Sequence, residues 1–382
     1  MQPLNVDLRP RSWPILLLLT AMAMTLAGAV VHAGAIMHAA PPIEEIRTIM
    51  LQRALWPPSS KSLAALDTEN LQAGLRAIDS YARYVPPSSL LGYSSPSPSL
   101  GIDIISYKSR PWVQADPGGP ADKAGIPEIG KLQAINGTKV FDVDFSKVLA
   151  LFDLAVRHGR VSLTLSSRSD GKRKTFKVQP VKFQSSSLMW RRIGDNVIVR
   201  IREFIAHDTA PGIAALYNTL VRSNSQVVID LRGCSGGDLY EAIEIAGMFV
   251  AAGLPLASTY DRSGMIQTYR APPGHKLASS TWLLIDRRTA SAAEIFAGIL
   301  QYYHLAHLVG EQSAGKCVSQ TPVPLSDGGK LWLTTLAIYF PNGMSCNGTG
   351  LEPDIPYHDI TVTKSIDIIA ELDSRTRVPQ KK

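Results

Sequence analysis

The sequence is poor in cysteine, in excess charge of either sign and in long apolar runs. Its 382 residues include three cysteines, Cys234, Cys317 and Cys346. These are too few for a disulfide scaffold, and they lack the C-x-x-C spacing of a zinc site. Lysine and arginine exceed aspartate and glutamate by only 7, and the excess is scattered, which argues against a nucleic-acid-binding protein. With 45% hydrophobic and 19% charged residues, the composition predicts a globular chain of two or three domains.

One apolar run stands near the N-terminus, at residues 13–31. Arg9 and Arg11 precede it, and small residues around Ala33 follow it, which is the pattern of a secretory signal peptide. A run of about 19 residues is also just long enough to span a bilayer as an uncleaved anchor. We therefore expect residues 1–40 to be a signal peptide or membrane anchor and the remainder to be soluble. The expected location is a bacterial periplasm.

Changes in pattern along the chain predict four further regions. Residues 41–95 are expected to be a helical segment and linker, because apolar residues recur at helical spacing up to a Ser/Pro-rich stretch. Residues 96–182 alternate short strands and helices around an Asn136-Gly137 hairpin turn. Residues 183–360 have a mixed α/β pattern that includes a buried strand at 227–231, and 361–382 are a tail with a surface helix and a frayed end.

The state of the cysteines is left open by the sequence. Cys317 and Cys346 lie in segments expected to be neighbouring strands, and an oxidising compartment would permit a bond between them. The alternative is three unpaired, partly buried thiols.

Two familiar kinds of site are excluded or disfavoured. The segment 310–317 resembles a phosphate-binding P-loop, but Cys317 stands where a serine or threonine must hold magnesium. Pro322 and Pro324 prevent the helix that such a loop needs. The pair His304 and His307 is expected to lie on a helix end without a third ligand, so no metal site is predicted.

Three other segments could carry chemistry. Ser291 begins an apolar helix, where it is either an N-cap completed by Glu294 or a nucleophile beside free backbone amides. Lys316 is either a solvated loop lysine or the occupant of a partly buried turn. The turn at 230–237 is either a tight strand-to-helix connection or a set of backbone N–H groups that hold an oxyanion.

Taken together, these segments resemble the carboxyl-terminal processing proteases, also called tail-specific proteases. Four ordered motifs carry the resemblance: Asp-Leu-Arg with Gly-Gly at 230–237, Thr-Ala-Ser-Ala-Ala-Glu-Ile at 289–295, Gly-Glu with Gly-Lys and Gln at 310–320, and Gly-x-Gly-x-Glu-Pro-Asp-Ile at 348–355. The family implies an α/β fold, with a crotonase-like catalytic core of mixed strands and helices at 183–360, an inserted PDZ domain at 96–182 and an N-terminal helical segment.

The resemblance also implies the roles of individual residues. It implies that Ser291 is the nucleophile, that Lys316 is the general base and that Gln320 orients this lysine. It also implies that the backbone N–H groups of Ala292 and Gly237 form the oxyanion hole, with Gly236 in place of Gly237 if the turn register slips. Burial can lower a lysine pKa far enough for it to act as a base. No metal or organic cofactor is implied.

The implied PDZ domain would bind a substrate C-terminus on the backbone amides of Gly101 and Ile102. The expected partners are therefore protein and peptide substrates, with no nucleic acid and with membrane contact only through the N-terminal segment; a homodimer is left open. Departures from the family pattern are Lys131, Cys234 and Ala293, which leave the implied mechanism intact. The rival hypothesis is a non-catalytic peptide- or ligand-binding protein on the same fold.

Overall fold

The computed structural model describes residues 40–87, 98–167, 171–183, 186–222, 225–274, 277 and 280–376. The predicted signal peptide or anchor at 1–40 therefore lies, apart from Ala40, outside the described residues. Among the described residues, no helix is both long and apolar enough to cross a membrane.

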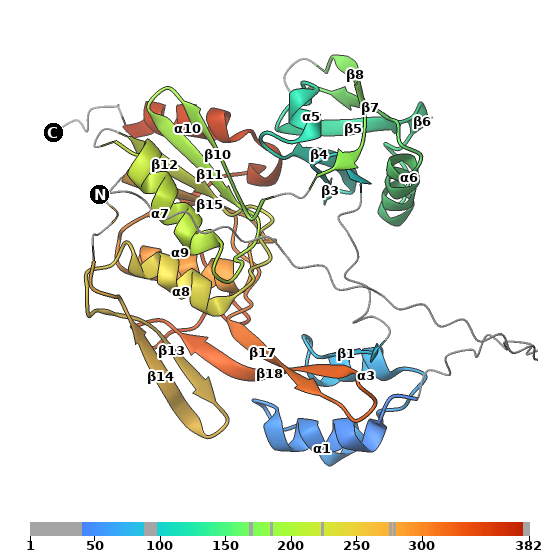
Figure 1. The fold of residues 1–382 in the computed structure, drawn as a ribbon, viewed down its shortest axis with the longest axis vertical. Helices are drawn as coiled ribbons and strands as arrows, with labels where there is room; N and C mark the ends of the chain where they lie inside the picture. The colour runs from blue at the N-terminus through green and yellow to red at the C-terminus, as the bar shows by residue number, and fades with distance from the viewer. Residues whose placement is uncertain are drawn as a thin grey trace, which may run out of the picture. The chain divides into compact units, whose positions relative to one another are not determined.

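A mostly parallel sheet lies at the centre of the 183–360 region (Figure 1). Its strands, in spatial order, are β10 (Leu188–Ile193), β11 (Asn196–Ile201), β12 (Gln226–Asp230), β15 (Ser280–Ile285), β16 (His307–Gly310) and β19 (Ile355–Pro356). β10 runs antiparallel to β11, and the other pairs are parallel. Runs of valine, isoleucine and leucine form the central strands because both faces of the sheet are covered.

Helices cover the two faces of this sheet, as Figure 1 shows. On one face lie α7 (Thr209–Leu220), α8 (Leu239–Gly247) and α9 (Ala292–Tyr302), and on the other lies α10 (Ser365–Thr376). The sequence predicted a surface helix in the tail, but Ile368, Ile369 and Leu372 of α10 are buried against the sheet. Their spacing places them on one helix face, so α10 is part of the core.

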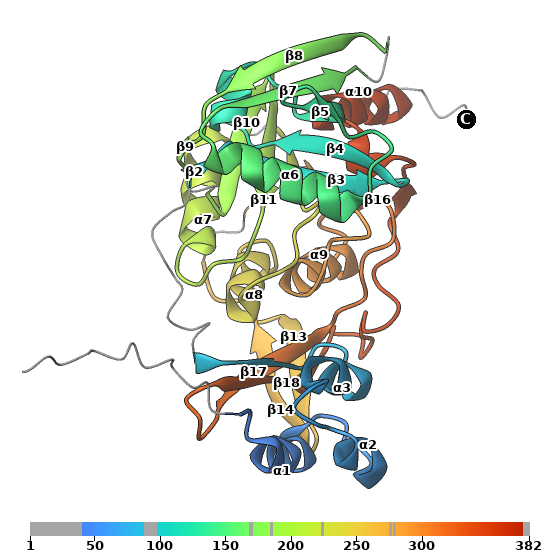
Figure 2. The same cartoon turned by 90° about the vertical axis from the view of Figure 1, so that its right-hand side faces the viewer.

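A second, antiparallel sheet packs beneath α8 and α9 (Figure 2). It contains β1 (Arg83–Val85), β13 (Pro255–Asp261), β14 (Gly264–Arg270), β17 (Val318–Pro324) and β18 (Lys330–Tyr339). The absence of a helix after Cys317, which excluded a P-loop, is confirmed by β17. This sheet joins the N-terminal segment to a strand that follows it by more than 200 residues, because β1 pairs with β18.

The helices predicted in the N-terminal segment are present as α1 (Ile43–Arg53), α2 (Ser60–Ala64) and α3 (Leu71–Ile78). Their apolar faces pack against Leu331 and Leu333 of β18. The segment then ends in the strand β1, which the sequence pattern did not indicate. It therefore shares both a sheet and an apolar core with the region that follows residue 183.

The 98–182 region forms two further antiparallel sheets, one of six strands and one of two, and has its own apolar core. Its elements are β2 (Pro98–Ser99), β3 (Ile102–Tyr107), β4 (Arg110–Ala115), α5 (Pro120–Lys123), β5 (Ile129–Ile135), β6 (Thr138–Lys139), α6 (Phe145–Arg157), β7 (Val161–Ser166), β8 (Arg173–Val178) and β9 (Val181–Lys182). The predicted Asn136-Gly137 turn is confirmed between β5 and β6, with positive φ at both residues. We call residues 98–182 the inserted module.

One buried arginine joins the parallel sheet to the C-terminal segment and to the inserted module. Arg232 donates to both carboxylate oxygens of Asp230, at 2.8 and 2.6 Å, and to the carbonyl oxygens of Ile360 and Thr363. Its Nη2 also donates to Glu128 of the module at 3.2 Å. An arginine side chain with 1% exposure needs this set of acceptors for its N–H groups, because an unpaired buried charge is costly.

Candidate active site

The three candidate segments follow the carboxyl ends of three adjacent parallel strands. β12 leads into the glycine turn, β15 into the Ser291 turn and β16 into the Lys316 turn. Because parallel strands end at the same edge of a sheet, this order alone brings the turns together, in the place where α/β folds bind ligands. Backbone hydrogen bonds of 2.9 Å connect them, from Ala290 to the Cys234 carbonyl and from Ala314 to the Thr289 carbonyl.

Ser291 has a strained backbone at the start of α9. Its φ is +58° and its ψ is −124°, which a residue with a side chain adopts at a cost of about 1–3 kcal/mol. Such strain persists only where the surroundings enforce it and is common at functional sites. The half-buried Ser291 side chain thus stands at a sharp turn between a buried strand and the amino end of a buried helix.

Glu294 holds the serine turn and the lysine turn together. Its carboxylate is fully buried and accepts four hydrogen bonds: from Ser291 N at 2.9 Å, Lys316 N at 2.7 Å, Gly315 N at 2.7 Å and Ser313 Oγ at 2.5 Å. The backbone N–H groups of Ser291 and Lys316 donate to the same carboxylate oxygen, Oε2. The backbones of the predicted nucleophile and base are therefore adjacent.

The sequence indicated only part of the role of Glu294. Its spacing from Ser291 predicted a capping box, and the bond from Ser291 N to Glu294 confirms the Glu294 half of it. Its contacts to the Lys316 turn could not be predicted, because no local pattern records that two turns 25 residues apart share one carboxylate.

Lys316 occupies a partly buried turn, in agreement with one of the two interpretations. Burial lowers the pKa of its ammonium group below the usual 10.5, and the positive charge of Arg83 lowers it further, whereas Asp79 and Glu294 act in the opposite direction. Its Nζ lies 4.9 Å from the centre of the Tyr81 ring. Lys316 Nζ and Ser291 Oγ, both among the described atoms, form no hydrogen bond with each other in this conformation.

The glycine turn approaches Ser291 most closely at Gly236. A Cβ placed on Gly236, which has a φ of +107°, would lie 2.7 Å from Ser291 Cβ and 2.9 Å from Ala292 N. Gly237, with a φ of +131°, instead lies against Phe204, whose carbonyl oxygen would be 2.2 Å from a Cβ there. Both positions require glycine. The backbones of Gly236 and Ala292 thus approach Ser291 closely, whereas Gly237, the donor that the resemblance implied first, lies against Phe204.

Gln320 lies on β17, four residues beyond Lys316. Its amide donates to Thr334 Oγ1 at 3.3 Å, and Thr334 Oγ1 donates to Asp79 at 3.0 Å. No hydrogen bond joins Gln320 to Lys316 within the described residues. The predicted orienting contact is thus absent in this conformation, and Gln320 belongs to a chain that leads to Asp79 beside the lysine.

Two of the three cysteines are joined next to the lysine. Cys317 and Cys346 form a disulfide with a Cα–Cα distance of 5.3 Å, so the pairing that the sequence left open is present. Cys234 is a free, buried thiol in the glycine turn, and burial raises its pKa to about 12. Cys317 and Cys346, with Glu294, are near enough to one another for a metal site, but their sulfurs are bonded and the carboxylate is saturated.

Gly101 and Ile102, the predicted peptide-binding residues, lie where β3 begins. β3 is an edge strand of the module sheet, so one side of it has no strand neighbour among the described residues. Gly101 has a φ of +64°, its N–H donates to Ser99 Oγ at 3.1 Å, and its carbonyl accepts from Asp116 N at 2.9 Å. The Ser99 contact occupies one of the two predicted amide donors.

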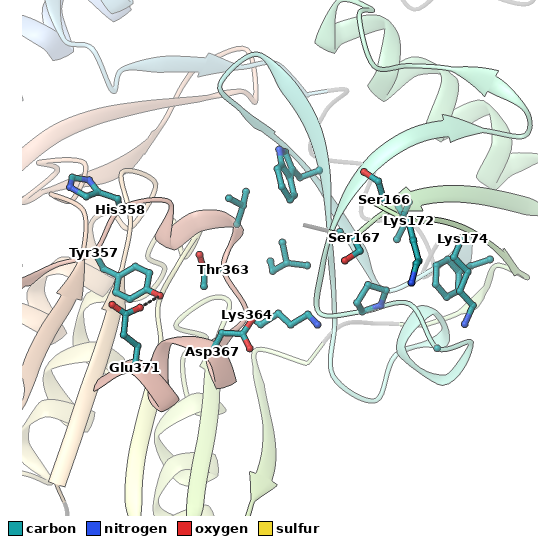
Figure 3. Close-up of a pocket in the computed structure, with 18 of the residues that line it drawn as sticks. Ser166, Ser167, Lys172, Lys174, Tyr357, His358, Thr363, Lys364, Asp367 and Glu371 are labelled. Carbon is teal, nitrogen blue, oxygen red and sulfur yellow. Dashed lines mark hydrogen bonds between the residues drawn. The ribbon is translucent and has the colours of Figure 1, made fainter. Parts of the chain in front are cut away.

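A large cavity lies away from these turns, between the inserted module and the C-terminal segment (Figure 3). Its volume is about 910 Å³, and Ser291, Lys316 and Gln320 do not line it. Figure 3 shows Lys172 and Lys174 on the module side and Asp367 and Glu371 on α10. Because none of the three turns contributes to its lining, the cavity does not replace the turn cluster as the candidate active site.

Comparisons with known proteins agree with this geometry. Residues 195–357, which contain all three turns, match the model of peptidase family S41. The chain is 27% identical over 310 residues to the chloroplastic C-terminal processing peptidase of Tetradesmus obliquus, covering 72% of this chain and 64% of that one. It is 28% identical over 244 residues to the carboxy-terminal processing protease CtpB of Bacillus subtilis (strain 168), covering 62% and 50%.

Two solved structures show the same fold. The photosystem II D1 C-terminal processing protease superposes with a TM-score of 0.53 and 22% identity, over 82% of this chain and 92% of that one. A Bacteroides fragilis NCTC 9343 protein described as an S41 protease superposes with a TM-score of 0.63 and 18% identity, over 87% and 97%. These identities establish the fold alone.

The chain spans between half and two thirds of the length of the curated relatives that it matches. The family match covers the strands and turns that bring Ser291, Lys316 and the glycine turn together. Residues 195–357 of this chain are thus similar to peptidase family S41.

Proposed function

We propose that this chain is a serine endopeptidase with Ser291 as nucleophile and Lys316 as general base. The observation that carries the proposal is the shared Glu294 carboxylate, which fixes the strained Ser291 turn beside a partly buried lysine. The S41 match and the names of the relatives support the same reaction class.

The reaction begins with the neutral form of Lys316, which burial and Arg83 favour by lowering the lysine pKa. Lys316 Nζ moves from the Tyr81 ring to Ser291 Oγ and takes its proton as the oxygen attacks the scissile carbonyl carbon. The C–N bond then breaks, the amine leaves with the proton from Lys316, and an acyl ester remains on Ser291. Water, deprotonated by Lys316, hydrolyses the ester and restores the serine.

The negative charge that develops on the carbonyl oxygen needs backbone donors near Ser291. The N–H of Ala292, at the amino end of α9, and the glycine turn supply them in our proposal. The close approach of Gly236 to Ser291 favours Gly236 over Gly237 as the second donor. Gln320 acts through Thr334 and Asp79, which limit where the lysine side chain can lie.

The inserted module serves as a PDZ domain that binds substrate C-termini. An extended peptide would add to the free edge of β3, with its carboxylate on the amides at Gly101 and Ile102. A substrate with an amidated C-terminus should therefore be cut more slowly than the free acid. Equal rates would remove the module from substrate recognition.

We further propose that the protein works after export, in a periplasm, on exported proteins. The basic and apolar pattern of residues 1–40 supports export, and the Cys317–Cys346 disulfide fits an oxidising compartment.

The test of the proposed function is cleavage of an unfolded protein with a small apolar C-terminus, followed by mass spectrometry. The wild type should produce fragments, whereas Ser291→Ala should not. Lys316→Arg should also be nearly inactive, because a guanidinium group cannot be deprotonated at working pH. An active Lys316→Arg enzyme would exclude the lysine as base, and a chain that binds the substrate without cutting it would support the non-catalytic alternative.

A further inference from the structure

Tyr81, in the N-terminal segment, contacts Lys316, the proposed general base. It lies between α3 and β1, where the chain runs beside β17 and β18 (Figure 2). Its ring is half-buried and packs against Val318 and Ala337, and Lys316 Nζ stands 4.9 Å from the ring centre. An ammonium group at this distance from the face of an aromatic ring is attracted to it.

The position of Tyr81 is fixed by Asp79. The Asp79 carboxylate accepts from Tyr81 N at 3.0 Å, from Thr334 N at 2.9 Å and from Thr334 Oγ1 at 3.0 Å. These bonds tie the segment before β1 to the strand that pairs with Gln320. The ring is thus held by the same sheet that carries the lysine turn.

We propose that Tyr81 is a positioning residue for Lys316: the tyrosine ring covers the lysine nitrogen and limits the lysine side chain to positions from which the nitrogen can move to Ser291. This inference rests on the proposed function, and it adds the N-terminal segment to the active site. The ring has two effects: it excludes water from the nitrogen, and its face attracts the ammonium form.

The charged and titratable groups that act on Lys316 come from the N-terminal segment and from α9. Asp79 and Arg83 flank Tyr81 in the N-terminal segment, and Glu294 lies on α9. Tyr81 itself stays neutral, because burial and the charges of Glu294 and Asp79 raise the pKa of its phenol above 10. Among the described residues its hydroxyl has no hydrogen-bond partner, so the ring carries the effect.

Three substitutions in the full-length chain separate the two effects. Tyr81→Phe keeps the ring and should retain kcat and the pH profile. Tyr81→Leu keeps an apolar cover but removes the attraction to the ammonium form, so the acid limb of kcat/KM should move to lower pH. Tyr81→Ala admits water, which favours the ammonium form, so the same limb should move to higher pH. In both Tyr81→Leu and Tyr81→Ala, kcat should fall about fivefold to tenfold with little change in KM.

Tyr84 supplies the matched control. It lies three residues further along, on β1, where its ring packs in the N-terminal core and its hydroxyl donates to Asp327. Tyr84→Leu should lower thermal stability without moving the acid limb. If Tyr81→Leu and Tyr81→Ala fold and keep the wild-type limb and kcat, or behave like Tyr84→Leu, the positioning role is refuted.

A measurement that needs no catalysis separates this inference from the proposed function. The rate at which trace acetic anhydride acetylates Lys316, followed by mass spectrometry against pH, gives the pKa of the lysine in each variant and in Ser291→Ala. Opposite shifts in Tyr81→Leu and Tyr81→Ala support the positioning role even in an inactive chain. Unchanged pKa values in a chain that cleaves substrate refute the role while the peptidase proposal stands.

Discussion

Replacing Glu294 with glutamine tests the buried link between the serine and lysine turns. The carboxylate accepts hydrogen bonds from Ser291 N, Lys316 N, Gly315 N and Ser313 Oγ. An amide of the same shape has one acceptor oxygen, and its NH₂ group would face two of these donors. Each hydrogen bond to a buried charged group contributes about 1.5–3 kcal/mol, so two lost bonds cost about 3–6 kcal/mol.

The assay is urea unfolding in the Ser291→Ala background, which prevents self-cleavage. Glu294→Gln should lower the free energy of unfolding by about 3–6 kcal/mol, within the 5–15 kcal/mol typical of a domain. The control is Glu311→Gln, on the same turn as Lys316. Its ion pair is with Arg287, whose side chain is 83% exposed, so the loss should be below about 1 kcal/mol.

With Ser291 present, folded Glu294→Gln should also lose most of its peptidase activity, because the serine and lysine turns are no longer fixed to one oxygen. A loss of stability no greater than that of Glu311→Gln, or full activity, would refute the reasoning that Glu294 joins the two turns.

Three further predictions follow from the same site. Gly236→Ala should lose activity at least about a hundredfold, because the added Cβ would lie 2.7 Å from Ser291 Cβ. The control Gly253→Ala should stay active, because Gly253, with a φ of +81°, has open space around it. Equal kinetics of the two variants would contradict the close approach of Gly236 to Ser291. The double variant Cys317→Ser, Cys346→Ser should lose about 3–4 kcal/mol in chemical unfolding, because the bond closes a loop between residues 29 apart; unchanged stability would exclude the bond in solution. Activity should rise with pH through the acid limb of kcat/KM, because the active form of Lys316 is neutral. The midpoint of this limb should lie below pH 10.5, because burial lowers the pKa of Lys316. A midpoint at or above pH 10.5 would contradict the partly buried surroundings of the lysine.

The location of the site was predictable because it depends on local patterns and strand order. A buried strand followed by a glycine turn at 230–237, and an apolar strand followed by Ser291 and an apolar helix, are each recognisable within about ten residues. Once the strands are parallel and adjacent, their turns must meet.

The less predictable features are contacts between segments distant in sequence. β1 has three residues and reads as the end of a helical segment, and its pairing with β18 is set by packing. Tyr81 meets Lys316 only because that pairing brings the N-terminal segment to the sheet. The hairpin β13–β14 was also missed, because its residues are largely polar and half-exposed and give no clear alternation.

The choice between Gly236 and Gly237 required backbone geometry. Both glycines satisfy the motif equally well in sequence, but Gly236 alone lies against Ser291, while Gly237 lies against Phe204. One residue of register in a turn is below the precision of any sequence pattern.

In the proposed reaction, Ser291 becomes the covalent nucleophile with the help of Lys316. The most direct measurement treats the folded chain with a fluorophosphonate probe and maps the labelled peptide by mass spectrometry. We expect a label on Ser291, none at this position in Ser291→Ala, and labelling at least about a hundredfold slower in Lys316→Arg. A folded wild type that cuts substrate without Ser291 being labelled, or a Lys316→Arg variant labelled at the wild-type rate, would contradict it.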